Sequence, residues 1–170
     1  MIRIAIANQK GGVGKTTTAI NIATAIAATG WRTLLVDMDP QGNASTGLGV
    51  HSKDRDYSTY DLLMQEGSVA QCTQKTRIPN LDVMPATQDL SGAEVELVAE
   101  TDRIDRLKSA LAEADGAYDV CFIDCPPSLG LLTLNALSAA DSLLVPLQCE
   151  FFALEGLSHC LLYTSPSPRD

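Results

Sequence analysis

The sequence predicts an α/β fold with a mostly parallel sheet flanked by helices. Short apolar segments that suit strands alternate with segments of helical periodicity, which is typical of parallel strands joined by right-handed crossovers. Three predicted strands lead directly into polar segments, at residues 8–17, 37–42 and 124–128. Because ligands of such sheets bind at the carboxyl ends of the strands, these segments are the first candidates for a shared site.

The first elements follow from the opening segment and the apolar periodicity after it. Residues 1–8, MIRIAIAN, are mostly apolar, as expected of a strand covered on both faces. A helix is expected over residues 16–28, whose apolar side chains recur at i, i+3 and i+4. A second apolar strand is expected over residues 33–37, and a short helix over residues 59–65.

The later elements continue this alternation. Ser91 and Glu94 have the spacing of a capping box, which predicts the start of a helix. The remaining strands are expected over residues 81–84, 120–124 and 142–146, and the remaining helices over residues 103–114 and 131–139.

The composition narrows the class of protein. A chain of 170 residues with 45% apolar residues can bury the core of one globular domain. Its net charge of -9 argues against the chain itself being a nucleic-acid binder, because phosphate contacts need a basic surface. The cysteines form no C-x-x-C pair and no signal peptide precedes them, so a reducing cytoplasm is expected, with Cys121 and Cys125 as core thiols. The sequence contains no apolar run of about 18 residues, so no membrane span is predicted.

The segment NQKGGVGKTT, residues 8–17, has the context of a phosphate-binding loop, between an apolar strand and a helix. Its glycines allow a tight turn that points backbone N–H groups inward, and the helix N-terminus adds partial positive charge. Lys15 is expected to reach the phosphates and Thr16 to ligate Mg²⁺. The predicted nucleotide-binding residues are Lys10, Gly11, Gly12, Val13, Gly14, Lys15, Thr16 and Thr17.

The loop departs from the usual pattern G-x-x-x-x-G-K-[ST] at its first position. Gln9 stands where the first glycine is expected, and a second lysine, Lys10, lies five residues before Lys15. The motif therefore predicts a phosphate site with one cation more than the usual loop supplies.

The other two polar segments supply carboxylates. Asp124 ends the strand VCFID, the usual place for an acid that holds Mg²⁺ or its water, although such an acid alone would more often cap or form a turn. Asp37 and Asp39 close the second strand, where a carboxylate can orient an attacking water. The alternative is a turn with solvated acids, and the sequence does not divide the roles between Asp37 and Asp39.

Four segments are distinctive when they are taken together: KGGVGKTT, LLVDMDPQGNAST, VCFIDCPPSLGLLTLNAL and VPLQCEFFALEGL. In combination they resemble the ParA/Soj family of chromosome- and plasmid-partition ATPases. The resemblance covers roughly residues 1–158 and places the chain in the deviant Walker A class. It implies a P-loop NTPase-like fold, with ATP and Mg²⁺ as the cofactors.

The resemblance also implies roles for single residues. Lys10 matches the signature lysine that reaches the partner's nucleotide in the ATP-bound dimer, so hydrolysis would depend on dimerisation. Asp39 matches the residue that positions the hydrolytic water, Asp37 lies on the Mg²⁺ side, and Asp124 matches the Walker B acid. The implied catalytic residues are Lys10, Lys15 and Asp39, and the implied metal residues are Thr16, Asp37 and Asp124.

The family's partners give the expected function. The resemblance implies an ATP-dependent homodimer that binds DNA without sequence preference and is stimulated by a ParB-like centromere-binding protein. A cytoplasmic, nucleoid-associated protein with no membrane contact is therefore expected. No helix-turn-helix segment precedes the first strand, so direct operator repression is not expected. The alternatives are a MinD-like or cargo-positioning regulator, or an inactive truncated chain.

The chain departs from the family after Ser158. The segment HCLLYTSPSPRD contains SPSP, which breaks a helix, and its apolar residues have nothing left to pack against. We therefore expect an incomplete ATPase domain over residues 1–158 and a non-native or disordered tail over residues 159–170, with a genuine short terminus as the alternative. In the family, the missing C-terminal part supplies much of the adenine pocket and most of the basic DNA-binding surface, so weak ATP binding and poor folding are expected of this chain.

Overall fold

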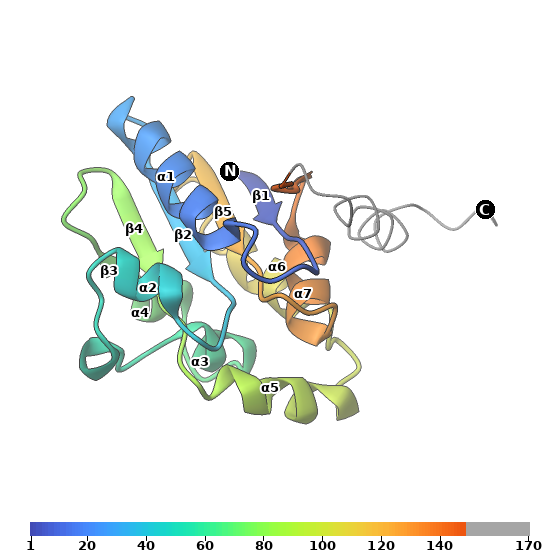
Figure 1. Ribbon diagram of the computed structural model, residues 1–170. Helices are drawn as coiled ribbons and strands as arrows, with labels where there is room; N and C mark the ends of the chain where they lie inside the picture. Colours follow the sequence, from blue (N-terminus) through green and yellow to red (C-terminus); the bar gives the residue numbers. More distant parts are fainter. Residues whose placement is uncertain (149–170) are drawn as a thin grey trace.

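The computed structural model describes residues 1–148, which contain one six-stranded sheet in the order β3-β4-β2-β5-β1-β6 (Figure 1). Neighbouring strands are parallel throughout, except that β3 and β4 are antiparallel. The predicted α/β fold with a mostly parallel sheet is confirmed. The strands are β1 (Ile2–Ile6), β2 (Thr33–Asp37), β3 (Gln74–Lys75), β4 (Leu81–Met84), β5 (Val120–Asp124) and β6 (Ser142–Leu144).

Helices cover both faces of the sheet. The α-helices are α1 (Lys15–Ala28), α2 (Asn43–Gly47), α3 (Thr59–Leu63), α4 (Val69–Cys72), α5 (Leu90–Glu96), α6 (Arg106–Ala112) and α7 (Leu131–Ala139), with 3₁₀ turns η1 (Ser52–Asp54) and η2 (Leu97–Ala99). Helices α1 and α2 lie on one face, and α3, α5, α6 and α7 on the other. None of the helices in residues 1–148 is long and apolar enough to cross a membrane.

Alternation along the central strands explains the two-sided core. On β5, Phe122 packs toward α1, whereas Cys121 and Ile123 pack toward the opposite helices. The face of α1 that meets the sheet is lined by Ala19 and Ala23, which are fully buried. These small side chains let α1 lie close to the sheet, and this fixes its N-terminal end beside the ends of the central strands.

Most predicted elements lie where the periodicity placed them. The strands at 33–37, 81–84 and 120–124 and the helix at 131–139 have the predicted bounds, and α1 begins one residue early at Lys15. The helix expected over residues 103–114 is shorter, because α6 spans Arg106–Ala112. The predicted boundary at residue 158 and the tail over residues 159–170 lie outside the described residues.

The start of α5 was predicted wrongly, and helices α2 and α4 and strand β3 were not predicted. Ser91 does not cap a helix, because α5 begins earlier, at Leu90, with Asp89 at its N-cap position. The side chain of Glu94 instead accepts a hydrogen bond from the Leu132 amide at 3.5 Å, at the start of α7. Strand β3 was not predicted, since two polar residues carry no apolar alternation.

Candidate nucleotide-binding site

The three polar segments meet at one end of the sheet. Strands β1, β5 and β2 are neighbours, and Asp124 is in register with Ile6 on one side and with Asp37 on the other. Their carboxyl ends therefore lie side by side, and the loop between β1 and α1 lies at the same end (Figure 1). The predicted convergence of the three segments is confirmed.

The loop between β1 and α1 has the backbone of a phosphate-binding loop. Gly12 and Gly14 have φ angles of 73° and 82°, in the left-handed region that favours glycine. Gly14 is the N-cap of α1, a 14-residue helix, and as a glycine it offers no side chain to cap the first turn. The amide groups of that turn and the helix dipole are therefore directed at the loop, where they can bind an anion.

Lys15 lies across the inside of this loop. Its side chain is buried, and its Nζ donates a hydrogen bond to the Lys10 carbonyl oxygen at 3.2 Å. A buried ammonium group is unfavourable unless its donors are satisfied, so the loop carbonyl stabilises this position. A phosphate oxygen in the loop would offer Lys15 a stronger, charged acceptor.

Asn8 anchors the start of the loop and was not predicted as a site residue. Its side chain is buried; Nδ2 donates to the Pro146 carbonyl oxygen at 2.9 Å and Oδ1 accepts from the Lys10 amide at 2.9 Å. Asn8 therefore connects the loop to the chain just after β6. An Asn at the end of a strand is a frequent turn former, which was the signal available in the sequence.

Asp124 is the most unusual group of the site. It is fully buried at the end of β5, and neither carboxylate oxygen has a hydrogen-bond partner in residues 1–148. Its pKa is raised to about 7: burial is the main cause, Asp37 and Asp39 add to the rise, and Thr16 and Lys15 act to lower it. Although Thr16 lies near enough to lower this pKa, its hydroxyl does not reach hydrogen-bonding geometry with the carboxylate. A buried, unpartnered carboxylate suits a hard divalent cation.

Asp37 is buried beside Asp124 but is fully partnered. Its Oδ2 accepts hydrogen bonds from the Ser45 amide at 2.9 Å and the Ser45 hydroxyl at 2.6 Å, and its Oδ1 accepts from the Asp39 amide at 3.1 Å. Burial raises the pKa of Asp37, and these hydrogen bonds act to lower it. Because protein groups already occupy its oxygens, the predicted role of Asp37 toward Mg²⁺ stays a prediction. Ser45 was not predicted, since a serine in a polar loop carries no distinctive signal.

Asp39 lies beyond the strand end and is half-buried. Its carbonyl oxygen accepts from the Gly42 amide at 2.8 Å, and its carboxylate oxygen Oδ1 accepts from the Gln41 amide at 2.9 Å. The acid is thus held in a turn at the edge of the site, whereas Asp37 is enclosed beneath it. The structure separates the surroundings of two acids that the sequence could not distinguish.

The segment after Asp124 lies against the loop. The Cys125 amide donates to the Ile6 carbonyl oxygen at 3.1 Å, and a Cβ added at Gly11 would lie 4.0 Å from Pro127 Cβ. Cys121 and Cys125 are buried, which confirms them as core thiols.

The acids of the site do not form a metal cage by themselves. Within the described part of the chain, no group of three or more His, Cys, Asp or Glu side chains is arranged to hold a metal ion. A Mg²⁺ ion that bridges nucleotide phosphates needs few protein ligands, and a loop hydroxyl with one carboxylate is the usual protein contribution. Thr16 and Asp124 fit that requirement.

Comparison with known proteins gives consistent relatives. The AAA domain family model matches residues 1–165. The chain is 58% identical over 160 residues to the chromosome partitioning protein ParA of Caulobacter vibrioides, covering 93% of this chain and 60% of that protein. It is 55% identical over 158 residues to the sporulation initiation inhibitor protein Soj of Bacillus subtilis, covering 93% of this chain and 62% of that one. The chain thus spans about three fifths of the length of these curated relatives.

A solved structure extends the comparison to a bound nucleotide. A crystal structure described as cobyrinic acid a,c-diamide synthase from Mycobacterium smegmatis, with a bound ATP analogue and magnesium, matches with a TM-score of 0.92 and 43% identity. The match covers 96% of this chain and 67% of that one.

Proposed function

Because the chain belongs to the ParA/Soj family of chromosome-partitioning ATPases, we propose that it binds ATP with Mg²⁺, dimerises in that state and hydrolyses ATP to ADP and phosphate. One observation carries the proposal: the buried Asp124 carboxylate has no hydrogen-bond partner in residues 1–148 and lies at the strand end beside the glycine-rich loop. A metal bound to nucleotide phosphates would satisfy both its charge and its oxygens.

The loop residues would bind the phosphates. The amides of the turn through Gly12 and Gly14 and the first turn of α1 supply donors, and Lys15 exchanges the Lys10 carbonyl for a phosphate oxygen. Thr16 and Asp124 would hold Mg²⁺, which neutralises phosphate charge when it is bound.

Asp39 and Lys10 would act on the reaction itself. Asp39 is half-exposed at the edge of the site, where a carboxylate can orient the attacking water. Lys10, supplied by the partner subunit of the dimer, would stabilise charge on the transferred phosphoryl group, as arginine fingers do in related enzymes. Hydrolysis would then occur only in the dimer, and the nucleotide would set its lifetime.

The partition function extends this switch to partners. We propose that residues 1–158 belong to the ATPase domain, with residues 159–170 as a separate tail. A ParB-like protein would stimulate hydrolysis, and non-specific DNA would bind through a part of the family's fold that this chain does not include. The protein would act in the cytoplasm at the nucleoid.

Calorimetric titration of the chain with MgATP tests the proposal, together with an ATPase assay and sedimentation with a slowly hydrolysed ATP analogue. Lys15→Ala should abolish binding. Lys10→Ala should retain binding but lower kcat by about 10³-fold or more, as expected for a cation supplied in trans. Lys53→Ala, at an exposed lysine on η1, is the matched control and should change neither. Absence of MgATP binding by the wild-type chain, or binding that survives Lys15→Ala, would overturn the proposal.

A further inference from the structure

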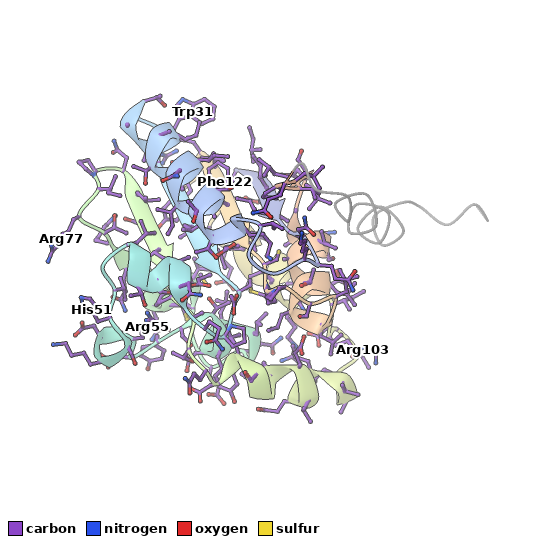
Figure 2. All side chains as sticks on the ribbon, viewed as in Figure 1. Trp31, His51, Arg55, Arg77, Arg103 and Phe122 are labelled. Carbon is purple, nitrogen blue, oxygen red and sulfur yellow. The ribbon has the colours of Figure 1, made fainter. Side chains whose placement is uncertain are left out.

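The guanidinium group of Arg55 is surrounded by backbone carbonyls. Nη1 donates to the Ala86 carbonyl oxygen at 2.8 Å, and Nη2 donates to the Val50 carbonyl at 2.8 Å and the Gly42 carbonyl at 3.3 Å. Nη2 also lies 2.8 Å from the Thr46 hydroxyl, and Nε donates to Val50 at 3.2 Å. Figure 2 labels Arg55 near α2, whereas Arg77 extends from the periphery of the molecule.

This set of partners depends on the shape of arginine. A guanidinium presents five N–H donors in a rigid planar fork, so it can join three chain segments at once, whereas a lysine ammonium cannot reproduce that geometry. Within residues 1–148, Arg55 forms no ion pair with a carboxylate. Its hydrogen bonds therefore connect the backbone between β2 and α2 with the backbone after β4.

One arm of a hydrogen-bonded ring leads from Arg55 to Asp37. Ala86, whose carbonyl oxygen binds Arg55, donates its own amide to the Ser45 hydroxyl at 3.0 Å. The Ser45 hydroxyl in turn donates to Asp37 Oδ2. All three of these residues are buried, so this arm is shielded from water.

The other arm returns from Asp37 to Arg55 through Asp39. Asp37 Oδ1 accepts from the Asp39 amide at 3.1 Å, and the Asp39 carbonyl oxygen accepts from the Gly42 amide at 2.8 Å. The Gly42 carbonyl oxygen accepts from Arg55 and closes the ring. The backbone of Asp39 is therefore held on one side by Asp37 and on the other by a turn that Arg55 supports.

Gly42 is required for this close approach. Its φ angle is 63°, and a Cβ at this position would overlap Arg55 Nη1 and lie 3.1 Å from the Ala86 carbonyl oxygen. A side chain there would displace the guanidinium group. The lack of a side chain at Gly42 thus leaves room for the Arg55 guanidinium group beside the turn.

We propose that Arg55 is a positioning residue for Asp39: it holds the turn that carries this acid and so fixes where the attacking water is oriented. The proposal rests on the proposed ATPase function. Since the hydrogen bonds of Arg55 reach neither the glycine-rich loop nor Asp124, its loss should affect the rate of hydrolysis and leave nucleotide affinity nearly unchanged.

The test compares Arg55→Ala and Arg55→Lys with wild type in MgATP affinity, kcat and amide hydrogen exchange. Arg55→Ala should lower kcat by about 10- to 100-fold, because small displacements of a positioning group have effects of that size, with MgATP affinity within about 2-fold. Arg55→Lys should recover only part of kcat. Amides of residues 39–46 and of Ala86 should exchange faster in both variants.

Arg77→Ala is the matched control, because Arg77 is exposed and forms no hydrogen bond or ion pair that reaches this turn. It should match wild type in all three measurements. Gly42→Ala should lower kcat as Arg55→Ala does, and the double variant should be no slower than the slower single variant, since both act on one support.

Each outcome either supports or overturns the proposed role of Arg55. An unchanged kcat with unchanged exchange in Arg55→Ala would overturn the proposal, as would parallel losses of kcat, nucleotide affinity and folded population, which indicate a merely structural role. If the wild-type chain binds MgATP but does not hydrolyse it, the proposed function fails instead. In that case, amide hydrogen exchange tests the role of Arg55 alone. If residues 39–46 stay protected in Arg55→Ala, Arg55 does not hold the turn; if their protection is lost, that role is supported.

Discussion

Asp37 and Asp124 are neighbours in register, yet their surroundings differ completely. Three hydrogen bonds from Ser45 and Asp39 satisfy the oxygens of Asp37, and neither oxygen of Asp124 has a partner in residues 1–148. The first acid organises the loop after β2, and the second keeps its oxygens available. Two identical side chains at adjacent strand ends thus suit different tasks, one within the protein and one toward a cation.

Asp124→Asn should stabilise the nucleotide-free chain at alkaline pH. The folded-state pKa of about 7 lies above the ordinary value of 3.8, so the carboxylate destabilises the folded state. The penalty is absent below about pH 4, grows as the pH rises to about 7 and is constant above, where it reaches about 4 kcal/mol at most. Urea unfolding should show a larger gain for the variant at pH 8 than at pH 5.5.

Function should change in the opposite direction in the same variant. The neutral amide cannot replace a carboxylate at a Mg²⁺ ion, so Asp124→Asn should lose the Mg²⁺ dependence of ATP binding while it gains stability. A stability difference that does not vary with pH would contradict the raised pKa. An affinity for MgATP equal to that of wild type would contradict the assignment of Asp124 to the metal.

At the scale of elements, the two ends of α1 provide a matched pair of glycines. Gly14 and Gly30 both have positive φ angles, and an added Cβ would meet no atom within 4 Å at either position. Alanine should therefore destabilise the fold by a similar amount at each end, about 1–2 kcal/mol, through backbone strain alone. Only Gly14→Ala should abolish MgATP binding, because relief of its strain turns the loop amides away from the phosphates.

Calorimetric titration and urea unfolding of the two variants separate these effects. Gly30→Ala serves as the control for stability, since Gly30 lies at the far end of the helix from the loop. Equal losses of MgATP affinity in both variants would mean that the loop is not the nucleotide site.

Helix α7 depends on one buried amide. Asn135 Nδ2 donates to the Arg103 carbonyl oxygen at 2.6 Å and to the Leu131 carbonyl oxygen at 2.9 Å, and Oδ1 accepts from the Leu107 amide at 3.2 Å. Asn135→Ala would leave the buried Leu107 amide without an acceptor and the Arg103 carbonyl without this donor, so urea unfolding should give a loss of about 1–3 kcal/mol. Asn21→Ala, at an exposed position on α1, should leave stability within about 0.5 kcal/mol. Equal effects of the two substitutions would contradict this account.

The elements that the sequence predicted well are those defined by apolar runs. Strand β5 and helix α7 have the predicted bounds, because continuous burial requires continuous apolar sequence. The capping box at Ser91 and Glu94 failed because the same spacing recurs by chance, and here Glu94 reaches the start of α7. Spacing alone does not say which backbone amide a side chain will meet.

The candidate site was predictable only where its residues belong to recognisable motifs. Lys15 and Asp124 belong to motifs in which residue type and strand context occur together, so their meeting at one end of the sheet could be predicted. Asn8, Ser45 and Arg55 could not be found in this way. Their partners include backbone atoms of Pro146 and Ala86, which are distant in sequence and carry no signature of residue type.

At the scale of the whole molecule, the order of the strands determines how deeply each is enclosed. Strand β5 lies between β1 and β2 with helices on both faces, so all five of its residues are buried. The strand that ends in Asp124 is therefore among the best-protected parts of residues 1–148. A rigid central strand places the acid that we assign to the metal, whereas Asp39 depends on a turn that other residues must hold.

The rates at which the buried thiols react can measure how well each part of the fold is enclosed. Burial raises the pKa of Cys121 on β5 to about 12 and that of Cys72 on α4 to about 11, and the thiolate is the reactive form. With Cys149→Ser and Cys160→Ser, whose positions lie outside the described residues, labelling by a thiol reagent at pH 8 reports on Cys72, Cys121 and Cys125. Native labelling of Cys121 should be at least about 10³-fold slower than in urea, because it requires opening of the central sheet.

Cys72 should be labelled earlier than Cys121 as urea is added. Helix α4 has only four residues and lies outside the sheet, so its opening need not disrupt β5, and local openings require less free energy than global unfolding. Mass spectrometry of peptides after timed labelling gives the rate at each cysteine. Equal rates for Cys72 and Cys121 at every urea concentration would show that the chain opens as a single unit. Rapid native labelling of Cys121 would contradict the enclosure of β5, and with it the rigid support that this strand gives to Asp124.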